Sequence, residues 1–461
     1  MMAHTHFIGI GGTGLSAIAR VLLERGQTVS GSDRELTPLA ARLQAAGATV
    51  YVGHDADHVK GADAVIRSSA VTKDNVEVTA ALGAGIPVLT RREYLAELLD
   101  GYRTIAVAGS HGKTTTTAML AWLLTKLGQA PGFIAGGDVN NLGTNARHGE
   151  SDLFVIEADE YDYMFLGLSP NLAVVTNVEH DHPDCFPTEE SFHQAFRDFA
   201  DRLESGGTLI VCADDVGAAK LRDYARAAGK DVKTYGFTNG PNYSARGLQS
   251  QKGSGYSFDA YKNGDHLAAV SLQIPGAHNV LNALAALAVA DHLHLFIEEA
   301  AAALEEFSGA GRRFQVLGEE QGVVVVDDYG HHPTEIRATL AAARARYPQR
   351  RIWAVWQPHT FSRTTQLLSE YGSAFADADV MIMTPVYAAR ESRPPGFSQE
   401  HILDAIEHDS KRFVTGLDEA TEILASEVES GDLVLVLSAG DADRVGAGLM
   451  RALKEKAHSH A

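Results

Sequence analysis

The chain has 461 residues, of which 45% are hydrophobic and 21% are charged, and its formal net charge is −20. This composition is typical of a folded protein with room for about three domains. The acidic balance argues against a nucleic-acid-binding surface, which needs clustered Lys and Arg. No apolar run approaches the length of a membrane span and no secretory signal is visible. Two cysteines, Cys185 and Cys212, give no disulfide framework. We therefore expect a cytoplasmic protein with no nucleic-acid or membrane partner.

Residues 1–100 alternate between strand-like apolar runs and helix-length amphipathic segments. This alternation is typical of a parallel α/β domain, and it predicts a Rossmann-like N-terminal domain. The strands are expected at 6–10, 28–33, 62–71 and 86–91, and the helices at 15–26 and 39–47.

The segment 98–103 interrupts the alternation of strands and helices. A second set of elements then forms a central domain, expected over 101–309. Its apolar runs lead into polar loops, which predicts a parallel sheet like that of the phosphate-loop ATPases. Short alternating runs at 237–275 predict a small antiparallel appendage on that sheet. A third, Rossmann-like domain is expected over 310–461. The fold class is therefore α/β with three domains.

The first strand is followed by "GIGGTG", which contains Gly9, Gly11, Gly12 and Gly14. Together with Asp33 at the end of the second strand, this pattern by itself suggests NAD binding. The glycines recognise a diphosphate at a helix N-terminus rather than a particular nucleotide, and a tight turn that needs small residues is the simpler alternative.

The second glycine-rich loop, "AVAGSHGKTTTT", departs from the standard phosphate loop because Val107 replaces its first glycine. Its strand–loop–helix context is nevertheless what a phosphate site needs. Lys113 would reach the β- and γ-phosphates, and Thr114 or Thr115 would offer a hydroxyl to Mg²⁺. The alternative is a helix start whose lysine points to solvent.

Polar side chains also follow the later strands, at the edge where α/β sheets bind ligands. Glu157 in "VIEADEYD" and His182 in "VTNVEHDHPD" are candidate Mg²⁺ ligands, although solvated loop charges are the simpler explanation of either alone. Asn279 and Asn282 are further candidates because they share one face of a helix start, and Arg313 is a candidate at a domain junction. The candidates that cluster at strand ends in the third domain are Asp328, Tyr329, His331, His359 and Arg363.

Together and in this order, these segments resemble the Mur ligase family of peptidoglycan synthesis over essentially the whole chain. The family's phosphate loop is similar to G-[TS]-x-G-K-T-T, which "GSHGKTT" fits. The matching segments are "HFIGIGGTGLSAIARVLL", "GSD", "SSAV", "GSHGKTTTT", "EADE", "GRRF", "DDYGHHPTEI" and "QPHTFSRT".

The resemblance implies an ATP- and Mg²⁺-dependent ligase. Lys113 would hold the ATP phosphates, and Thr114, Glu157 and His182 would ligate Mg²⁺. The rest of the ATP site would comprise Gly109, Ser110, His111, Gly112, Thr115, Asn279, Asn282, Arg313 and Asp328. Tyr329, His331, His359 and Arg363 would approach the incoming amino acid and the reacting carboxyl. The "GIGGTG" glycines, Asp33, Ser68 and Ser69 would hold the UDP part of a sugar nucleotide, so the ligand would be a UDP-sugar and not NAD.

Within the family, the segments are most similar to the members that join L-alanine to UDP-N-acetylmuramate, which implies these two substrates and a monomer or homodimer. Tyr161 is more like the members that recycle murein peptides, and Thr360 stands where some relatives carry arginine. Residues 183–202 contain no lysine, which argues against the members that use a carbamoylated lysine there. Either His331 or His359 could be the base.

Overall fold

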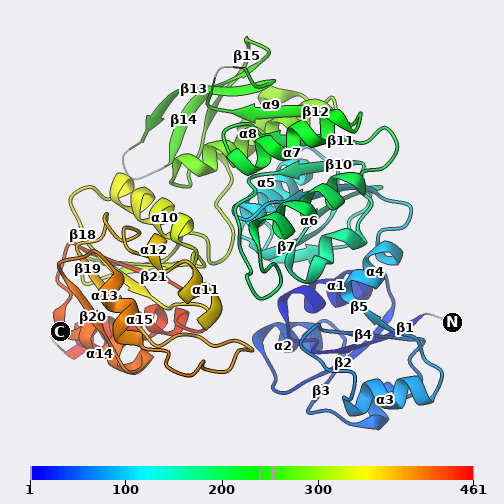
Figure 1. Cartoon of the computed structure of the whole chain (residues 1–461), viewed down its shortest axis with the longest axis horizontal. Coiled ribbons are helices and arrows are strands. Elements are labelled where there is room, and N and C mark those ends of the chain that lie inside the picture. The colour runs from blue at the N-terminus through cyan, green and yellow to red at the C-terminus, as the bar shows by residue number, and fades with distance from the viewer. Residues whose placement is uncertain (1–2, 239, 252–254, 460–461) are drawn as a thin grey trace.

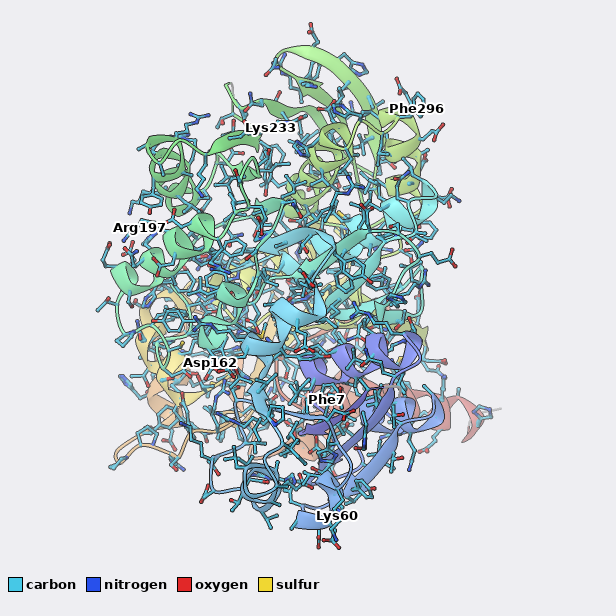
Figure 2. The ribbon with its side chains drawn as sticks, turned by 90° about the vertical axis from the view of Figure 1, so that its right-hand side faces the viewer. Phe7, Lys60, Asp162, Arg197, Lys233 and Phe296 are labelled. Carbon is cyan, nitrogen blue, oxygen red and sulfur yellow. The ribbon has the colours of Figure 1, made fainter. Side chains whose placement is uncertain are left out.

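The computed structural model describes residues 3–238, 240–251 and 255–459. The chain forms three units in sequence order, each built around its own sheet (Figure 1). The N-terminal unit is blue, the middle unit cyan to green, and the C-terminal unit yellow to red. Figure 2 shows Phe7 inside the N-terminal unit and Lys60 at its tip, while Lys233 and Phe296 lie at the opposite end of the molecule.

The N-terminal sheet has five parallel strands in the order β3-β2-β1-β4-β5. Because β1 pairs with both β2 and β4, the strand order reverses at β1, and the loops after β1 and β4 lie side by side. The strands are β1 (His4–Ile8), β2 (Thr28–Asp33), β3 (Thr49–Val52), β4 (Ala64–Arg67) and β5 (Val88–Thr90). The helices are α1 (Thr13–Glu24), α2 (Pro38–Ala45), η1 (Ala56–Val59), α3 (Val76–Gly83) and α4 (Arg91–Leu98).

The middle sheet has ten strands in the order β15-β14-β13-β12-β11-β10-β6-β9-β7-β8. Its parallel centre places β6 between β10 and β9, so the loops that follow these three strands converge on one edge. The strands are β6 (Arg103–Ala108), β7 (Gly132–Val139), β8 (Thr144–Arg147), β9 (Leu153–Glu157), β10 (Leu172–Val175), β11 (Thr208–Cys212), β12 (Asp231–Gly236), β13 (Tyr243–Ser250), β14 (Tyr256–Lys262) and β15 (Asp265–Ser271). The helices are α5 (Lys113–Lys126), η2 (Tyr161–Gly167), α6 (Glu189–Asp201), α7 (Val216–Ala227), α8 (Ala277–His292) and α9 (Ile297–Glu305).

The antiparallel appendage predicted at 237–275 is confirmed, because β13, β14 and β15 pair antiparallel at one end of the middle sheet. An antiparallel pair at the other end, β7 with β8, was not expected. The sequence of β7, "GFIAGGDV", does not alternate regularly between apolar and polar residues, and it contains three glycines. The burial of this segment beside β9 therefore comes from tertiary packing and not from a local pattern.

The C-terminal sheet has the order β16-β17-β21-β18-β19-β20. All its pairs are parallel except the edge pair of β16 with β17. The buried runs of β17 and β21 are apolar on both faces, as expected for strands that helices cover on both sides. The strands are β16 (Gln315–Glu320), β17 (Val323–Asp328), β18 (Arg351–Trp356), β19 (Val380–Met383), β20 (Lys411–Phe413) and β21 (Asp432–Leu437). The helices are α10 (Pro333–Arg346), α11 (Phe361–Gln366), α12 (Leu368–Tyr371), α13 (Gln399–Ala405), α14 (Leu417–Glu427) and α15 (Asp443–Ser459).

Two helices of the C-terminal unit, α10 and α11, lie on the side of that unit that meets the middle unit (Figure 1). Helix α10 starts with a capping box between His332 and Glu335, with Pro333 at its first position. Within the part of the chain that the structure describes, no helix is both long and apolar enough to cross a membrane.

Candidate active site

The phosphate loop connects β6 to α5 and has a tightly constrained backbone. Gly109 has φ +134° and Gly112 has φ +80°, where a side chain would be strained. A Cβ at Gly109 would lie 2.0 Å from Thr176 Oγ1. The segment that follows β10 holds the loop in place, because Ser110 Oγ donates a hydrogen bond to the Glu179 carbonyl at 2.6 Å. Only a glycine at 109 lets the loop approach β10 this closely.

Lys113, the first residue of α5, turns back into its own loop. Its Nζ donates to the Gly109 carbonyl at 2.6 Å and lies 2.8 Å from Glu160 Oε2. Burial lowers the pKa of Lys113, but the carboxylates of Glu160 and Asp159 outweigh it and the net pKa is raised. Burial raises the pKa of Glu160 to about 7, against the effect of Lys113. Sequence reasoning missed Glu160 as a partner of the lysine, although it is the last residue of the quoted "EADE".

Thr114, in the first turn of α5, and Glu157, the last residue of β9, are brought together. Thr114 Oγ1 donates to Glu157 Oε1 at 3.1 Å, and the Gly136 amide donates to Glu157 Oε2 at 2.5 Å. Arg313 Nη2 approaches Thr114 Oγ1 at 3.4 Å from the linker into the C-terminal unit. A hydroxyl and a carboxylate side by side are hard oxygen donors, so this pair fits Mg²⁺.

His182 lies in a different set of contacts. Its Nδ1 accepts a hydrogen bond from Arg363 Nη2 at 3.1 Å, and its Nε2 is 3.7 Å from both Asp181 Oδ2 and Glu160 Oε1. Burial lowers the pKa of His182, so the ring is neutral and its proton is on Nε2. In this arrangement His182 presents N–H rather than a lone pair on its Nε2 side, and no described contact joins it to Thr114 or Glu157.

A cavity of about 260 Å³ opens beside the phosphate loop, between the middle and C-terminal units. Asn282 Nδ2 donates to Asn279 Oδ1 at 3.0 Å, and Asn279 Nδ2 donates to the Pro275 carbonyl at 2.6 Å, so the two amides share one face as predicted. The site residues predicted from the sequence that line this cavity are His111, Gly112, Thr115, Asn279, Asn282, Arg313 and Asp328.

Asp328 reaches the cavity from the end of β17. Its carboxylate accepts hydrogen bonds from the Phe314 and Gly330 amides, both at 2.7 Å. Burial raises the pKa of Asp328 to about 6, and Arg313 opposes that rise. Tyr329 lies next to it under the guanidinium of Arg313, which is 5.0 Å from the ring centroid. Asp328 thus holds the turn that carries Tyr329.

The side chain of Arg363, in α11, joins three other side chains. Its Nε donates to Asp181 Oδ1 at 2.7 Å, and its Nη1 donates to His359 Nδ1 at 2.9 Å, besides the bond to His182. Arg363 is buried and Asp181 is buried with it. Asp181 was not singled out in the sequence, yet it is the acid directly before His182. His331 lies close by, with its ring centroid 5.3 Å from that of His359.

A second bridge between the two units is made by His111 of the phosphate loop. Its Nε2 is 2.9 Å from Glu179 Oε2, and its Nδ1 is 3.2 Å from Glu335 Oε1 in α10. Burial lowers the pKa of His111, but the two carboxylates raise it to about 10, so the imidazolium is the stable form. Thr334 Oγ1 donates to Glu179 from the same helix start. His111 therefore acts as an ion-paired link between the units.

The "GIGGTG" loop lies at the point where the N-terminal strand order reverses. Gly9 has φ +89°, and a Cβ there would lie 3.0 Å from Ser68 Cβ, so the two predicted loops are in contact. Gly12 is the N-cap of α1, and Ser69 is exposed. Asp33 Oδ2 accepts from the Gly11 amide at 2.8 Å, which means that Asp33 shapes the loop itself.

One arginine joins this loop to the middle unit. The Arg91 guanidinium lies against Gly14, and its Nη2 is 3.0 Å from Asp159 Oδ2. Asp159 precedes Glu160, the partner of Lys113. The N-terminal glycine loop and the phosphate loop are therefore linked through a few side chains.

Comparison with known protein families matches almost the whole chain. The model described as "Mur ligase family, catalytic domain" matches residues 4–103, "Mur ligase middle domain" matches 107–290, and "Mur ligase, glutamate ligase domain" matches 312–440. These three matches follow the order of the three sheets.

The chain is also similar to curated proteins over its full length. It is 43% identical over 457 residues to UDP-N-acetylmuramate–L-alanine ligase of Desulforamulus reducens, covering 98% of each chain. It is 44% identical over 453 residues to the protein of the same name from Geotalea daltonii, again covering 98% of each.

Solved structures show the same fold. The UDP-N-acetylmuramate–alanine ligase of Thermotoga maritima superposes with a TM-score of 0.84 at 30% identity, covering 99% of this chain and 100% of that one. A murein peptide ligase from Psychrobacter arcticus gives a TM-score of 0.73 at 27% identity, covering 98% of each chain. From its three matched domains and its full-length relatives, the chain belongs to the Mur ligase family.

Proposed function

We propose that this protein is an ATP-dependent ligase that joins L-alanine to the lactyl carboxylate of UDP-N-acetylmuramate. The observation that carries the proposal is the meeting of two sites at one interface. The phosphate loop with Lys113 lies in the middle unit, and Arg363 of the C-terminal unit is hydrogen bonded to Asp181 of the same middle-unit edge. A triphosphate and an amino acid bound there would be neighbours.

The first step is phosphoryl transfer. The lactyl carboxylate attacks the γ-phosphorus of ATP, which gives an acyl phosphate and ADP. Lys113 would leave Glu160 to neutralise the charge that builds up on the phosphoryl oxygens. Thr114 and Glu157 would hold Mg²⁺, which supplies further charge neutralisation when it is bound. His182 could join as a ligand through Nε2 only after its proton has moved from Nε2 to Nδ1, which requires release of the Arg363 bond.

The other site residues predicted from the sequence divide between two binding sites. The cavity beside Gly112, with Thr115, Asn279, Asn282, Arg313 and Asp328, would hold the nucleoside part of ATP. The UDP-sugar would bind across Gly9, Gly11, Gly12 and Gly14, with Ser68 and Ser69 beside them, where the N-terminus of α1 would face its diphosphate. Both nucleotides are metabolites of the cytoplasm, where we expect the protein to act as a monomer or homodimer.

The second step is amide formation. The amine of L-alanine attacks the acyl carbon, and phosphate leaves from a tetrahedral intermediate. Contacts between the middle and C-terminal units would exclude water, which otherwise hydrolyses the acyl phosphate.

A murein-peptide recycling ligase is the second candidate, because Tyr161 is more like those proteins. Tyr161 donates to Asp184 at 3.0 Å and lies 4.2 Å from the Arg390 guanidinium, so its side chain is used in local contacts. The curated relatives at 43–44% identity carry the L-alanine name, which favours the first reading.

The test is phosphate release from Mg-ATP and UDP-N-acetylmuramate with L-alanine or the murein tripeptide added in turn. We expect release with L-alanine. Release with the tripeptide alone would replace the proposal by the recycling activity. A dehydrogenase built on "GIGGTG", or a non-catalytic nucleotide-binding scaffold, would give no amino-acid-dependent ADP at all.

A further inference from the structure

The loop between β19 and α13 folds back over the turn that joins β18 to α11. The Tyr387 amide donates to the Pro358 carbonyl at 2.8 Å, and the Thr360 amide donates to the Tyr387 carbonyl at 2.9 Å. Farther along the loop, Glu391 Oε2 accepts a hydrogen bond from the Ser362 amide at 2.9 Å. The part of the loop between these contacts is therefore held at both ends by the same turn.

Between the two anchors, this loop places Arg390 against the middle unit. Ala389 has φ +50°, which turns the chain sharply just before the arginine. The guanidinium carbon of Arg390 lies over the Tyr161 ring, 4.2 Å from its centroid, in a cation–π contact. Arg390 is exposed and makes no ion pair with any residue that the structure describes. Figure 1 shows the loop in orange, extending from the C-terminal unit toward the other units.

Tyr161 lies between Arg390 and the buried interface of the two units. Its hydroxyl donates to Asp184 Oδ2 at 3.0 Å, and its ring meets the His182 ring edge-on, with 5.0 Å between centroids. His182 in turn accepts a hydrogen bond from Arg363, which is only 2% exposed. Arg390, Tyr161, His182 and Arg363 thus follow one another from the surface to the interface where the proposed ligase would receive its amino acid.

The same loop also covers the other partly exposed neighbour of Arg363. Tyr387 stacks on His359, with 5.7 Å between the ring centroids and 19° between the ring planes. His359 is hydrogen bonded to Arg363, as is Asp181, which is buried. Both partly exposed sides of Arg363, at His182 and at His359, are therefore bounded by side chains of this loop or by Tyr161, which the loop contacts.

A single amino acid and a peptide differ in what lies beyond the reacting amine. In L-alanine the carboxylate follows directly on the α-carbon, so the whole molecule would fit at the interface beside Arg363. In a peptide that carboxyl group is an amide, and the chain continues. Its further residues need an opening to the surface, and the positions beside Arg363 where such an opening would lie are covered by Tyr387 and by the contact of Arg390 with Tyr161.

We infer that the contact between Arg390 and Tyr161 closes the acceptor site against peptides and so restricts the enzyme to a free amino acid. This inference rests on the proposed ligase function and deepens it, because it names the residue pair that limits the length of the acceptor. It also gives Tyr161 a role, since the tyrosine supplies the ring over which the arginine of the other unit closes.

The experiment opens the contact from each side. Arg390→Ala removes the guanidinium, and Tyr161→Ser removes the ring. Arg393→Ala is the matched control, because Arg393 is an exposed arginine of the same loop whose side chain contacts Phe397 within that loop. Each enzyme is given Mg-ATP and UDP-N-acetylmuramate with either L-alanine or the murein tripeptide. ADP release gives kcat/KM for each acceptor, and mass spectrometry identifies the ligated product.

We expect the wild type and Arg393→Ala to use L-alanine at least about 100-fold better than the tripeptide, the scale on which pocket size separates substrates. In Arg390→Ala and Tyr161→Ser the ratio of kcat/KM for the tripeptide to that for L-alanine should rise about tenfold or more. Ligation of L-alanine by Arg390→Ala should stay within about threefold of wild type, because the arginine does not contact the reacting groups.

An unchanged ratio in both variants would overturn the inference, as would a wild-type enzyme that uses the tripeptide as well as L-alanine. Faster ADP release without a peptide product would also overturn it, because the loop would then exclude water rather than peptides. If the wild type releases no ADP in response to L-alanine, the proposed function fails instead.

Discussion

Lys113 and Glu160 form an ion pair in which the ammonium nitrogen lies 2.8 Å from a fully buried carboxylate. The lysine begins α5, and the glutamate follows β9. The pair therefore joins the phosphate loop to the adjacent strand end, and it gives the lysine a structural role besides any role toward a nucleotide.

Replacing the lysine should consequently affect both catalysis and stability. Lys113→Met should lower ADP formation by about 10³-fold or more, because a preorganised cation on the transferred phosphoryl group is lost. It should also lower the free energy of unfolding by about 3–5 kcal/mol, since Glu160 is left buried without its partner. The measurements are coupled ADP release and thermal unfolding. The matched variant is Lys113→Met with Glu160→Gln, which should regain stability but not activity. A double variant as unstable as the single one would show that the pair is not the cause.

Because the hydroxyl of Thr114 lies beside Glu157, we expect its removal to change how the rate depends on Mg²⁺. Thr114→Val removes the donor to Glu157 and one oxygen ligand, so the Mg²⁺ concentration for half-maximal rate should rise about tenfold, the cost of one good ligand or hydrogen bond. Thr117→Val is the control, because the Thr117 hydroxyl in the same helix is buried with no partner among the described residues. Equal Mg²⁺ curves for both variants would argue against a metal at Thr114.

The ion pairs of His111 should make the free energy of unfolding depend on pH. Its pKa is raised to about 10 in the folded protein from about 6.5 when unfolded, so its contribution is complete below about pH 6.5 and is lost as the pH rises through 10. Between these values the free energy of unfolding should fall by up to about 1.4 kcal/mol per pH unit relative to a neutral variant. Melting temperatures of wild type and His111→Gln from pH 6.5 to 9.5 check this. A difference between them that does not shrink toward high pH would contradict the ion-paired link.

The N-terminal glycine loop gives a prediction specific to the sugar nucleotide. Asp33→Ala removes the acceptor of the Gly11 amide, so the loop loses its fixed shape and the KM for UDP-N-acetylmuramate should rise about tenfold, while the KM for ATP is unchanged. Asp57→Ala, an exposed position in the same unit, is the control. Steady-state kinetics with each substrate varied separately gives both constants. A parallel rise in the KM for ATP would place Asp33 in a general structural role.

The sequence predicted the fold class and the loops of the site because parallel strands end at a common edge. Glu157 and Arg363 are candidates by that rule, and the family resemblance implies their roles. The acidic partners of Lys113 and Arg363 were missed, since Glu160 and Asp181 lie close in sequence to predicted residues and look like ordinary loop charges. What distinguishes them is burial beside Lys113 and Arg363, and burial is a tertiary property.

The sequence pattern also did not predict the local backbone geometry of the site. Thr360 has φ +61°, uncommon for a β-branched residue, and its Oγ1 accepts from the Arg363 amide at 3.4 Å as the N-cap of α11. Its neighbour, His359, pairs with Tyr387 in an isolated bridge. The sequence showed only a threonine where some relatives carry arginine. The structure gives it a role in shaping the turn between His359 and Arg363.

Asp328 lines the cavity beside Gly112 and Arg363 reaches Asp181, yet Asp328 ends strand β17 and Arg363 lies in α11 of the same C-terminal unit. A rotation of that sheet as one body would move both at once. An inhibitor that fills the cavity beside Gly112 and pushes Asp328 outward would then also separate Arg363 from Asp181 and disrupt the proposed amino-acid site, without touching Arg363. Compounds found by screening against nucleotide binding should for this reason appear competitive with the amino acid, although they occupy a different site.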